Sequence, residues 1–212
     1  MVTMATSLPN LLTYSRIAAI PVVVGLILSQ LLWAEWLALG IYIAACITDF
    51  LDGYLARAWQ QQSSLGRFLD PIADKLLIAS LLMVMVGVDT IGSISIMPAL
   101  VILCREFLVS GLREYLAEVR VGLPVSRLAK WKTGIQMTAI GFLVVSDSEI
   151  VVLGITPVEV GIVGLWIAAL LTLVTGYDYL RHSYDHIERS QTVPETVDAV
   201  KVPESGSVRS SG

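Results

Sequence analysis

Long apolar stretches separated by short polar segments run along most of this chain. Several continue for about 17 to 20 residues without a charge, which lets an α-helix cross a bilayer core about 30 Å thick. The pattern predicts six helical spans, at residues 9–29, 35–59, 70–88, 94–119, 129–147 and 157–182. Prolines, tolerated in a first helical turn, fall near four predicted starts, at Pro9, Pro71, Pro98 and Pro157. We therefore expect an all-α polytopic membrane protein with six transmembrane helices.

The composition points the same way. Of the 212 residues, 55% are hydrophobic and only 15% are charged, whereas soluble domains average about a quarter charged residues. The apolar run after Arg16 is too long for the core of a signal peptide, and no clear cleavage site follows it, so we expect the first span to be retained. Cys46 and Cys104 both lie in predicted spans, which favours small core residues over a disulfide.

Basic residues are distributed unevenly between the polar connections. The connections near residues 30–35, 89–93 and 148–156 contain no Lys or Arg, and the basic residues fall at the opposite ends of the spans. The positive-inside rule therefore places both termini in the cytoplasm of a cell (inner) membrane protein. Residues 1–189 form the predicted membrane domain, and residues 190–212, rich in Ser, Pro, Val and Gly, are expected to be a disordered cytoplasmic tail.

Four aspartates lie close together at the cytoplasmic ends of the second and third spans, at Asp49, Asp52, Asp70 and Asp74. The first two are three residues apart and share a helix face, which continues with the small residues Gly53 and Ala56. The second pair is four residues apart. Because a short connection makes two helices antiparallel neighbours, the two acidic pairs are expected to face each other.

Four carboxylates at one membrane interface repel each other unless cations lie between them. Carboxylate oxygens favour Mg²⁺ or Mn²⁺, and two ions would suit a reaction at a diphosphate. The alternative is that the acids pair with nearby basic side chains as solvated interfacial charge, at Arg57, Arg67 and Lys75. A glycine inside a helix costs about 1 kcal/mol relative to alanine, so Gly53 favours a close approach by a ligand.

The aspartates form part of a longer motif, D-x2-D-G-x2-A-R-x8-G-x3-D-x3-D, from Asp49 to Asp74. This motif resembles the signature of the CDP-alcohol phosphotransferases. The resemblance implies a six-span helical fold, a homodimer, and two divalent ions held by Asp49, Asp52 and Asp70. It implies that Asp74 is the general base and also touches a metal. It further implies a cytidine-nucleotide pocket shaped by Asp52, Gly53, Ala56, Arg57 and Gly66.

Basic residues in the second half suggest which alcohol accepts the transferred group. Arg105 lies well inside a predicted span, and a phosphate pocket beside the metals would explain it together with Arg113, Lys130 and Lys132. The alternative is that Arg105 pairs with Glu106 or with the aspartates, and that the other basic residues mark the cytoplasmic face.

Further segments resemble the branch of the family that transfers a phosphatidyl group from CDP-diacylglycerol to sn-glycerol 3-phosphate. They read PNLLTYSR, REFLVSGLREYLAE and AKWKT. By this resemblance Asn10, Thr13 and Arg16 line the same cavity; the alternative is that they cap and anchor the first helix.

The sequence is also compatible with other functions. The same chemistry could use inositol phosphate, serine or phosphatidylglycerol as acceptor. A cation transporter could carry intramembrane acids along an ion path, but it would need acids near the bilayer midplane, and these acids cluster at one face. A prenyl-diphosphate enzyme also uses aspartates for Mg²⁺, with acids that are usually more densely paired.

Overall fold

The computed structural model describes residues 8–59, 64–118, 127–146 and 154–192. These residues form six long α-helices and one short 3₁₀-helix, and they contain no strand. The helices are α1 (Leu8–Leu28), α2 (Leu32–Trp59), α3 (Ser64–Gly87), α4 (Ile96–Glu118), α5 (Arg127–Val144) and α6 (Pro157–Thr192), with η2 (Ser93–Ser95) before α4. The predicted all-α class is confirmed.

Four of these helices are long and apolar enough to cross a membrane, through Leu11–Leu28, Leu32–Asp49, Ser93–Ala117 and Pro157–Tyr177. In α3 and α5, every window of about 18 residues, the length of a short membrane span, includes at least three charged side chains. Those charged residues lie in the N-terminal halves of the two helices, and they include Asp70 and Asp74 in α3 and Lys130 and Lys132 in α5. The six predicted spans are compatible with this arrangement.

Two helix boundaries differ from the sequence prediction. Helix α3 begins at Ser64 rather than at residue 70, so Pro71 lies inside the helix. Pro71 removes one backbone hydrogen bond, which membrane helices tolerate when neighbouring groups satisfy the freed carbonyl. Helix α6 continues to Thr192 rather than ending at 182. Its polar extension contains no glycine or proline after Gly176, and the next proline is Pro194.

Helix α6 begins at Pro157, as predicted, and a capping box fixes this start. The backbone N–H of Thr156 donates to Glu159 Oε2 at 2.8 Å, and the N–H of Glu159 donates to Thr156 Oγ1 at 3.3 Å. This reciprocal pair is a capping box, and it satisfies two N–H groups that the helix itself leaves unpaired. Pro157 then occupies the first helical position, where its missing N–H costs nothing.

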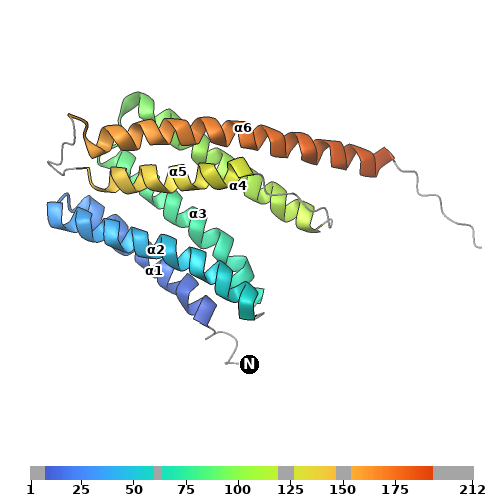
Figure 1. Ribbon diagram of the computed structural model, residues 1–212, viewed down its shortest axis with the longest axis horizontal. Helices are drawn as coiled ribbons and strands as arrows, with labels where there is room; N and C mark the ends of the chain where they lie inside the picture. Colours follow the sequence, from blue (N-terminus) through green and yellow to red (C-terminus); the bar gives the residue numbers. More distant parts are fainter. Residues whose placement is uncertain (1–7, 60–63, 119–126, 147–153, 193–212) are drawn as a thin grey trace, which may run out of the picture.

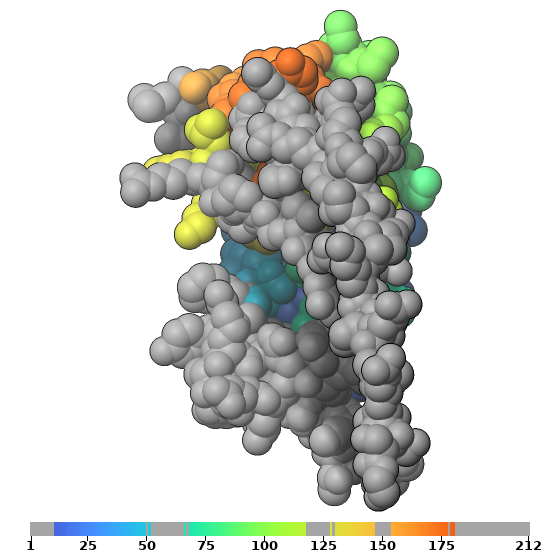
Figure 2. All heavy atoms as spheres, turned by 90° about the vertical axis from the view of Figure 1, so that its right-hand side faces the viewer, coloured from blue at the N-terminus to red at the C-terminus, as the bar shows by residue number. Residues whose placement is uncertain are grey.

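The helices pack in two groups that meet along α2, α3, α4 and α5. Helix α1 packs against α2 and α3, and α6 packs against α4 and α5 (Figure 1). In the view turned by 90° (Figure 2), α6 in orange lies beside α4 in green, with α5 in yellow next to it. A single cluster of buried apolar residues joins the two groups, including Val23, Leu81, Ile102, Ile140 and Leu165. Many large apolar side chains face outward, as expected for helices in contact with lipid.

Candidate active site

A buried arginine on α1 binds two of the predicted aspartates. Arg16 is only 2% exposed. Its Nη1 lies 2.9 Å from Asp49 Oδ1 on α2 and 2.6 Å from Asp74 Oδ1 on α3. Because both oxygens contact one nitrogen, the two carboxylates converge on a single point. A charge this deeply buried needs such partners, so Arg16 fixes where both carboxylates lie.

A second residue of α1 holds a third aspartate. Thr13, three residues before Arg16 and on the same helix face, donates its hydroxyl to Asp70 Oδ1 at 2.5 Å. Thr13 is 1% exposed. Of the two interpretations for the first helix, these contacts favour a role at the site over capping and anchoring. Neither Thr13 nor Arg16 lines the cavity next to these carboxylates, so both act through the aspartates. Asn10 lies in α1, but its side chain is outside the described part of the chain.

The remaining motif residues of the second helix can be placed only by their backbone. Helix α2 continues unbroken through Trp59, so Asp52, Gly53 and Ala56 do share the face of Asp49, as predicted. The side chains of these residues and of Arg57 lie outside the description. Gly66 lies in the first turn of α3 and is buried.

The carboxylates fit a divalent ion by their chemistry. Asp49 and Asp74 each keep a third or more of their side chain exposed, at 33% and 42%, and both converge on a cation nitrogen. Oxygen donors of this kind suit Mg²⁺ or Mn²⁺. Among the side chains that the structure describes, no three acidic, histidine or cysteine residues gather as one metal site. Asp52, the fourth predicted ligand, is not among them.

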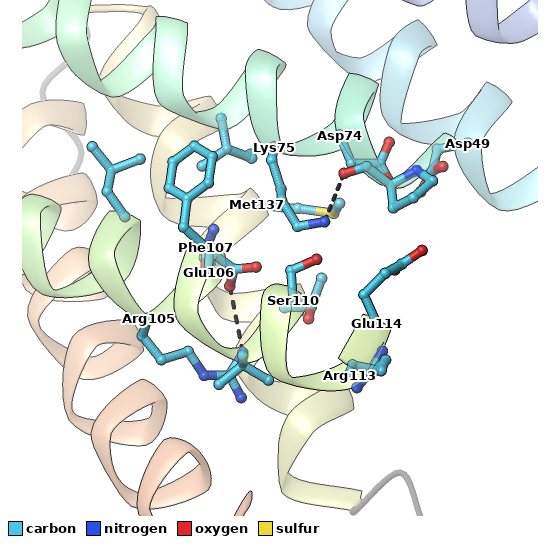
Figure 3. Close-up of a pocket in the computed structure, with 16 residues that line it drawn as sticks. Asp49, Asp74, Lys75, Arg105, Glu106, Phe107, Ser110, Arg113, Glu114 and Met137 are labelled. Atoms are coloured by element: carbon cyan, nitrogen blue, oxygen red, sulfur yellow. Dashed lines mark hydrogen bonds and ion pairs between the residues drawn. The ribbon is translucent and has the colours of Figure 1, made fainter. Parts of the chain in front are cut away.

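Asp49 and Asp74 line a cavity of about 350 Å³ bounded by α2, α3, α4 and α5. Arg105 and Arg113, both on α4, line the same cavity. Figure 3 shows the two carboxylates on one side of this space and the two guanidinium groups on the other, with Ser110 between them. Acidic residues of α2 and α3 and basic residues of α4 therefore share one cavity, as the acceptor hypothesis requires.

The other predicted phosphate ligands divide between two places. Lys132 is 3% exposed, and its Nζ contacts Glu106, which also lies 3.7 Å from Arg105 Nη1. Glu106 therefore shares its charge between two cations beside the cavity. Lys130 instead lines a second hollow, between α5 and α6, with Trp131 and Gly134. Residues two apart on a helix point about 200° apart, so the helical period itself separates Lys130 from Lys132.

Helix α6 contributes contacts that hydropathy does not reveal. Arg105 Nη2 donates to Thr175 Oγ1 at 3.1 Å, and Arg113 Nη2 donates to the Tyr179 hydroxyl at 3.4 Å. The predicted span 157–182 suggested no site residue. The local sequence signal for these contacts is that Tyr179 follows Thr175 by four positions, which places two polar groups on one face of α6.

Comparison with known proteins agrees with this geometry. The model of the CDP-alcohol phosphatidyltransferase family matches residues 6–174. The chain belongs to this family. The CDP-alcohol phosphatidyltransferases are enzymes and generally depend on divalent metals, so the predicted resemblance and the predicted enzyme class are confirmed. The apolar helices are consistent with a multi-pass membrane protein.

Named relatives cover most of the chain. The CDP-diacylglycerol–glycerol-3-phosphate 3-phosphatidyltransferase of Rickettsia bellii (strain RML369-C) is 47% identical over 177 residues, which make up 82% of this chain and 94% of the relative. A Cereibacter sphaeroides protein of the same name is 37% identical over 215 residues, covering 86% and 97%. A cardiolipin synthase (CMP-forming) of Oryza sativa subsp. japonica is 35% identical over 188 residues, covering 82% of this chain and 56% of that protein.

Proposed function

We propose that this protein transfers the phosphatidyl group of CDP-diacylglycerol to sn-glycerol 3-phosphate, releasing CMP and phosphatidylglycerophosphate for phospholipid synthesis. One observation carries the proposal: the cavity brings the carboxylates of Asp49 and Asp74 together with the guanidinium groups of Arg105 and Arg113. The first pair suits a metal-bound diphosphate, and the second suits the phosphate of an acceptor. The relatives that carry this activity in their names, at 47% and 37% identity, support the same reaction.

The donor would bind at the carboxylate side of the cavity. Asp49, Asp52, Asp70 and Asp74 would hold two Mg²⁺ or Mn²⁺ ions, by resemblance to the family. When bound, such ions neutralise the diphosphate oxygens and the leaving phosphate. The small residues after Asp52 would accept the cytidine nucleotide close to the α2 backbone, with Gly53, Ala56, Arg57 and Gly66 forming its pocket.

The reaction forms one phosphorus–oxygen bond and breaks another. A hydroxyl oxygen of the acceptor attacks the phosphorus that carries diacylglycerol, and the bond from that phosphorus to the bridging oxygen breaks. CMP leaves with the bridging oxygen and its electron pair. Asp74 takes the proton of the attacking hydroxyl. Arg16, on the far side of that carboxylate, orients it by the 2.6 Å ion pair. General-base assistance of this kind contributes about 10²–10⁴-fold in rate.

The acceptor side favours a phosphorylated alcohol. Arg105 and Arg113 supply forked donors that match phosphate geometry. Lys132 pairs with Glu106 and so offsets the negative charge that Glu106 places beside Arg105. Serine carries no phosphate, so it would not offer the two guanidinium groups the oxygen geometry that their forked donors match. Inositol phosphate and phosphatidylglycerol also carry a phosphate that the two arginines could bind. Phosphatidylglycerol is the second candidate acceptor because one relative, from rice, is named as a cardiolipin synthase.

The experiment is an acceptor panel. Protein purified in detergent is supplied with CDP-diacylglycerol and Mg²⁺ or Mn²⁺, and CMP release is measured with glycerol 3-phosphate, inositol phosphate, serine or phosphatidylglycerol. The proposal predicts CMP release that depends on glycerol 3-phosphate and a lipid product that contains it. Release with inositol phosphate, serine or phosphatidylglycerol alone would reject the proposed acceptor.

We also propose that the cavity faces the cytoplasm, from the distribution of Lys and Arg in the connections. Asp89, exposed after α3, would then face the other side of the membrane. A cysteine placed at Asp89 should react with a membrane-impermeant maleimide in spheroplasts. Labelling only after the membrane is broken would reverse the orientation. The homodimer implied by the family stays a prediction, for which cross-linking in native membranes is the test.

A further inference from the structure

The two arginines of the cavity meet at one aromatic ring on α6. The Cζ atoms of Arg105 and of Arg113 each lie 5.7 Å from the centre of the Tyr179 ring. The Tyr179 hydroxyl also accepts a hydrogen bond from Arg113. Tyr179 is 5% exposed, so its position is fixed by packing rather than by solvent. Guanidinium groups at this distance are attracted by the electron-rich face of an aromatic ring.

Other α6 residues hold Arg105 from two directions. Thr175, one turn before Tyr179, accepts a hydrogen bond from Arg105 Nη2 at 3.1 Å and donates its own hydroxyl to the Leu171 carbonyl at 2.8 Å. That second bond fixes the orientation of the Thr175 oxygen. The stem of Arg105 passes close to Gly176, where a Cβ atom would lie 3.2 Å from Arg105 Cγ. Helix α6 therefore contacts Arg105 both along its stem and at its guanidinium group.

Two cations close together repel, and each long side chain loses rotamer freedom when it is held. A shared neutral ring attracts both guanidinium groups and so offsets part of their mutual repulsion. Because α6 already holds the two side chains, their rotamer freedom is lost before the ligand binds. An anion entering the cavity would then meet donors already in place, and preorganisation of this kind raises affinity.

We infer that Tyr179 and Thr175 are positioning residues: Tyr179 holds Arg105 and Arg113, and Thr175 holds Arg105, in the orientation that binds the phosphate of the acceptor. This inference rests on the proposed function. Tyr179 acts through the two arginines and does not line the cavity. Helix α6 would thus determine acceptor affinity while α1 holds the aspartates.

The test compares kinetic constants in variants of the full protein. Tyr179→Leu removes the ring, and Thr175→Val removes the oxygen that accepts from Arg105 at nearly constant shape. We expect Tyr179→Leu to raise the KM for glycerol 3-phosphate about tenfold and Thr175→Val about threefold. In both, the KM for CDP-diacylglycerol and the kcat at saturating acceptor should stay within about twofold. Tyr179→Phe keeps the ring and should raise the acceptor KM less than Tyr179→Leu does.

Thr172→Val is the matched control. Thr172 lies three residues before Thr175, is fully buried, and its hydroxyl has no hydrogen-bond partner among the described residues. Its replacement should leave both KM values unchanged, and thermal unfolding in detergent checks that each variant folds.

The outcomes separate the inference from the proposed function. A wild-type protein that releases no CMP with glycerol 3-phosphate rejects the function itself. An active wild type whose acceptor KM is unchanged in Tyr179→Leu and Thr175→Val overturns the positioning role. The positioning role is also overturned if the two KM values and kcat all change equally, because such a result would indicate a general disturbance of α6 packing. If Tyr179→Leu does not fold, the Thr175→Val and Tyr179→Phe results decide alone.

Discussion

Helices α5 and α6 are in close contact at Gly161, and the distances there allow the effect of a substitution on stability to be estimated. A Cβ atom added at Gly161 would lie 2.6 Å from Leu143 Cγ, 2.8 Å from Leu143 Cδ2 and 3.1 Å from the Ala139 carbonyl oxygen. Carbon atoms in good contact are about 3.5–4.0 Å apart. Leu143 is 1% exposed, so it has little room to move aside. Gly161→Ala must therefore push the two helices apart or force Leu143 from its rotamer.

Overpacking of this kind costs about 1–3 kcal/mol, and the higher helix propensity of alanine returns up to about 1 kcal/mol. We expect a net loss of about 1–2 kcal/mol, which corresponds to a fall in Tm of about 2–8 °C for a chain of this size. The control is Gly134→Ala on α5, where an added Cβ meets no atom within 4 Å. That variant should match or exceed the Tm of the wild type.

The assay is thermal unfolding of purified protein in detergent, followed by the loss of the monodisperse peak on size-exclusion chromatography after heating. Gly164→Ala is a second test of the same contact, because its added Cβ would lie 2.8 Å from Ala139 Cβ. Equal Tm values for Gly161→Ala, Gly164→Ala and Gly134→Ala would refute the argument that the two glycines of α6 permit the close approach.

Three further predictions concern the cavity and the opposite end of the bundle. Arg113→Ala should raise the KM for glycerol 3-phosphate about tenfold, whereas Lys130→Ala should raise it at most about twofold because Lys130 lines a different hollow; equal rises would place the acceptor elsewhere. Glu35→Ala should lower stability by about 1–3 kcal/mol, since the carboxylate is 3% exposed and accepts from the Ser146 hydroxyl at 2.9 Å, and an unchanged Tm would argue against this bond. Chelation of divalent cations should abolish CMP release and Mg²⁺ or Mn²⁺ should restore it, so activity that survives thorough chelation would contradict a metal-dependent reaction.

The helices and the aspartate motif were predictable because both depend on local sequence. Stretches without charge locate helices of membrane length, and the spacing of Asp49 and Asp52 places them on one face of α2 in any continuous helix. The start of α3 was misplaced because Pro71 was interpreted as a first-turn residue, whereas the helix begins seven residues earlier. The segment from Ser64 to Asp70 mixes polar and apolar residues, so its hydropathy does not mark a helix start.

Contacts between distant helices were beyond the reach of local patterns. The sequence suggests two interpretations for Arg16, and only its burial against Asp49 and Asp74 separates them. Tyr179 looks like one more aromatic residue at a membrane interface until α4 brings two arginines to its ring. By contrast, the separation of Lys130 from Lys132 follows from the helical period alone and was available from the sequence.

The most direct test of the account is the role of Asp74, because the proposed chemistry requires its carboxylate to take the acceptor proton. Asp74→Asn keeps the size of the side chain, and Asp89→Asn is the matched control, at an exposed position with φ 60° that asparagine also tolerates. CMP release with glycerol 3-phosphate and direct binding of CDP-diacylglycerol are measured for both. We expect Asp74→Asn to lose at least about 10²-fold in turnover while still binding the nucleotide lipid, and Asp89→Asn to behave as the wild type. Near-normal turnover in Asp74→Asn would contradict this role of Asp74.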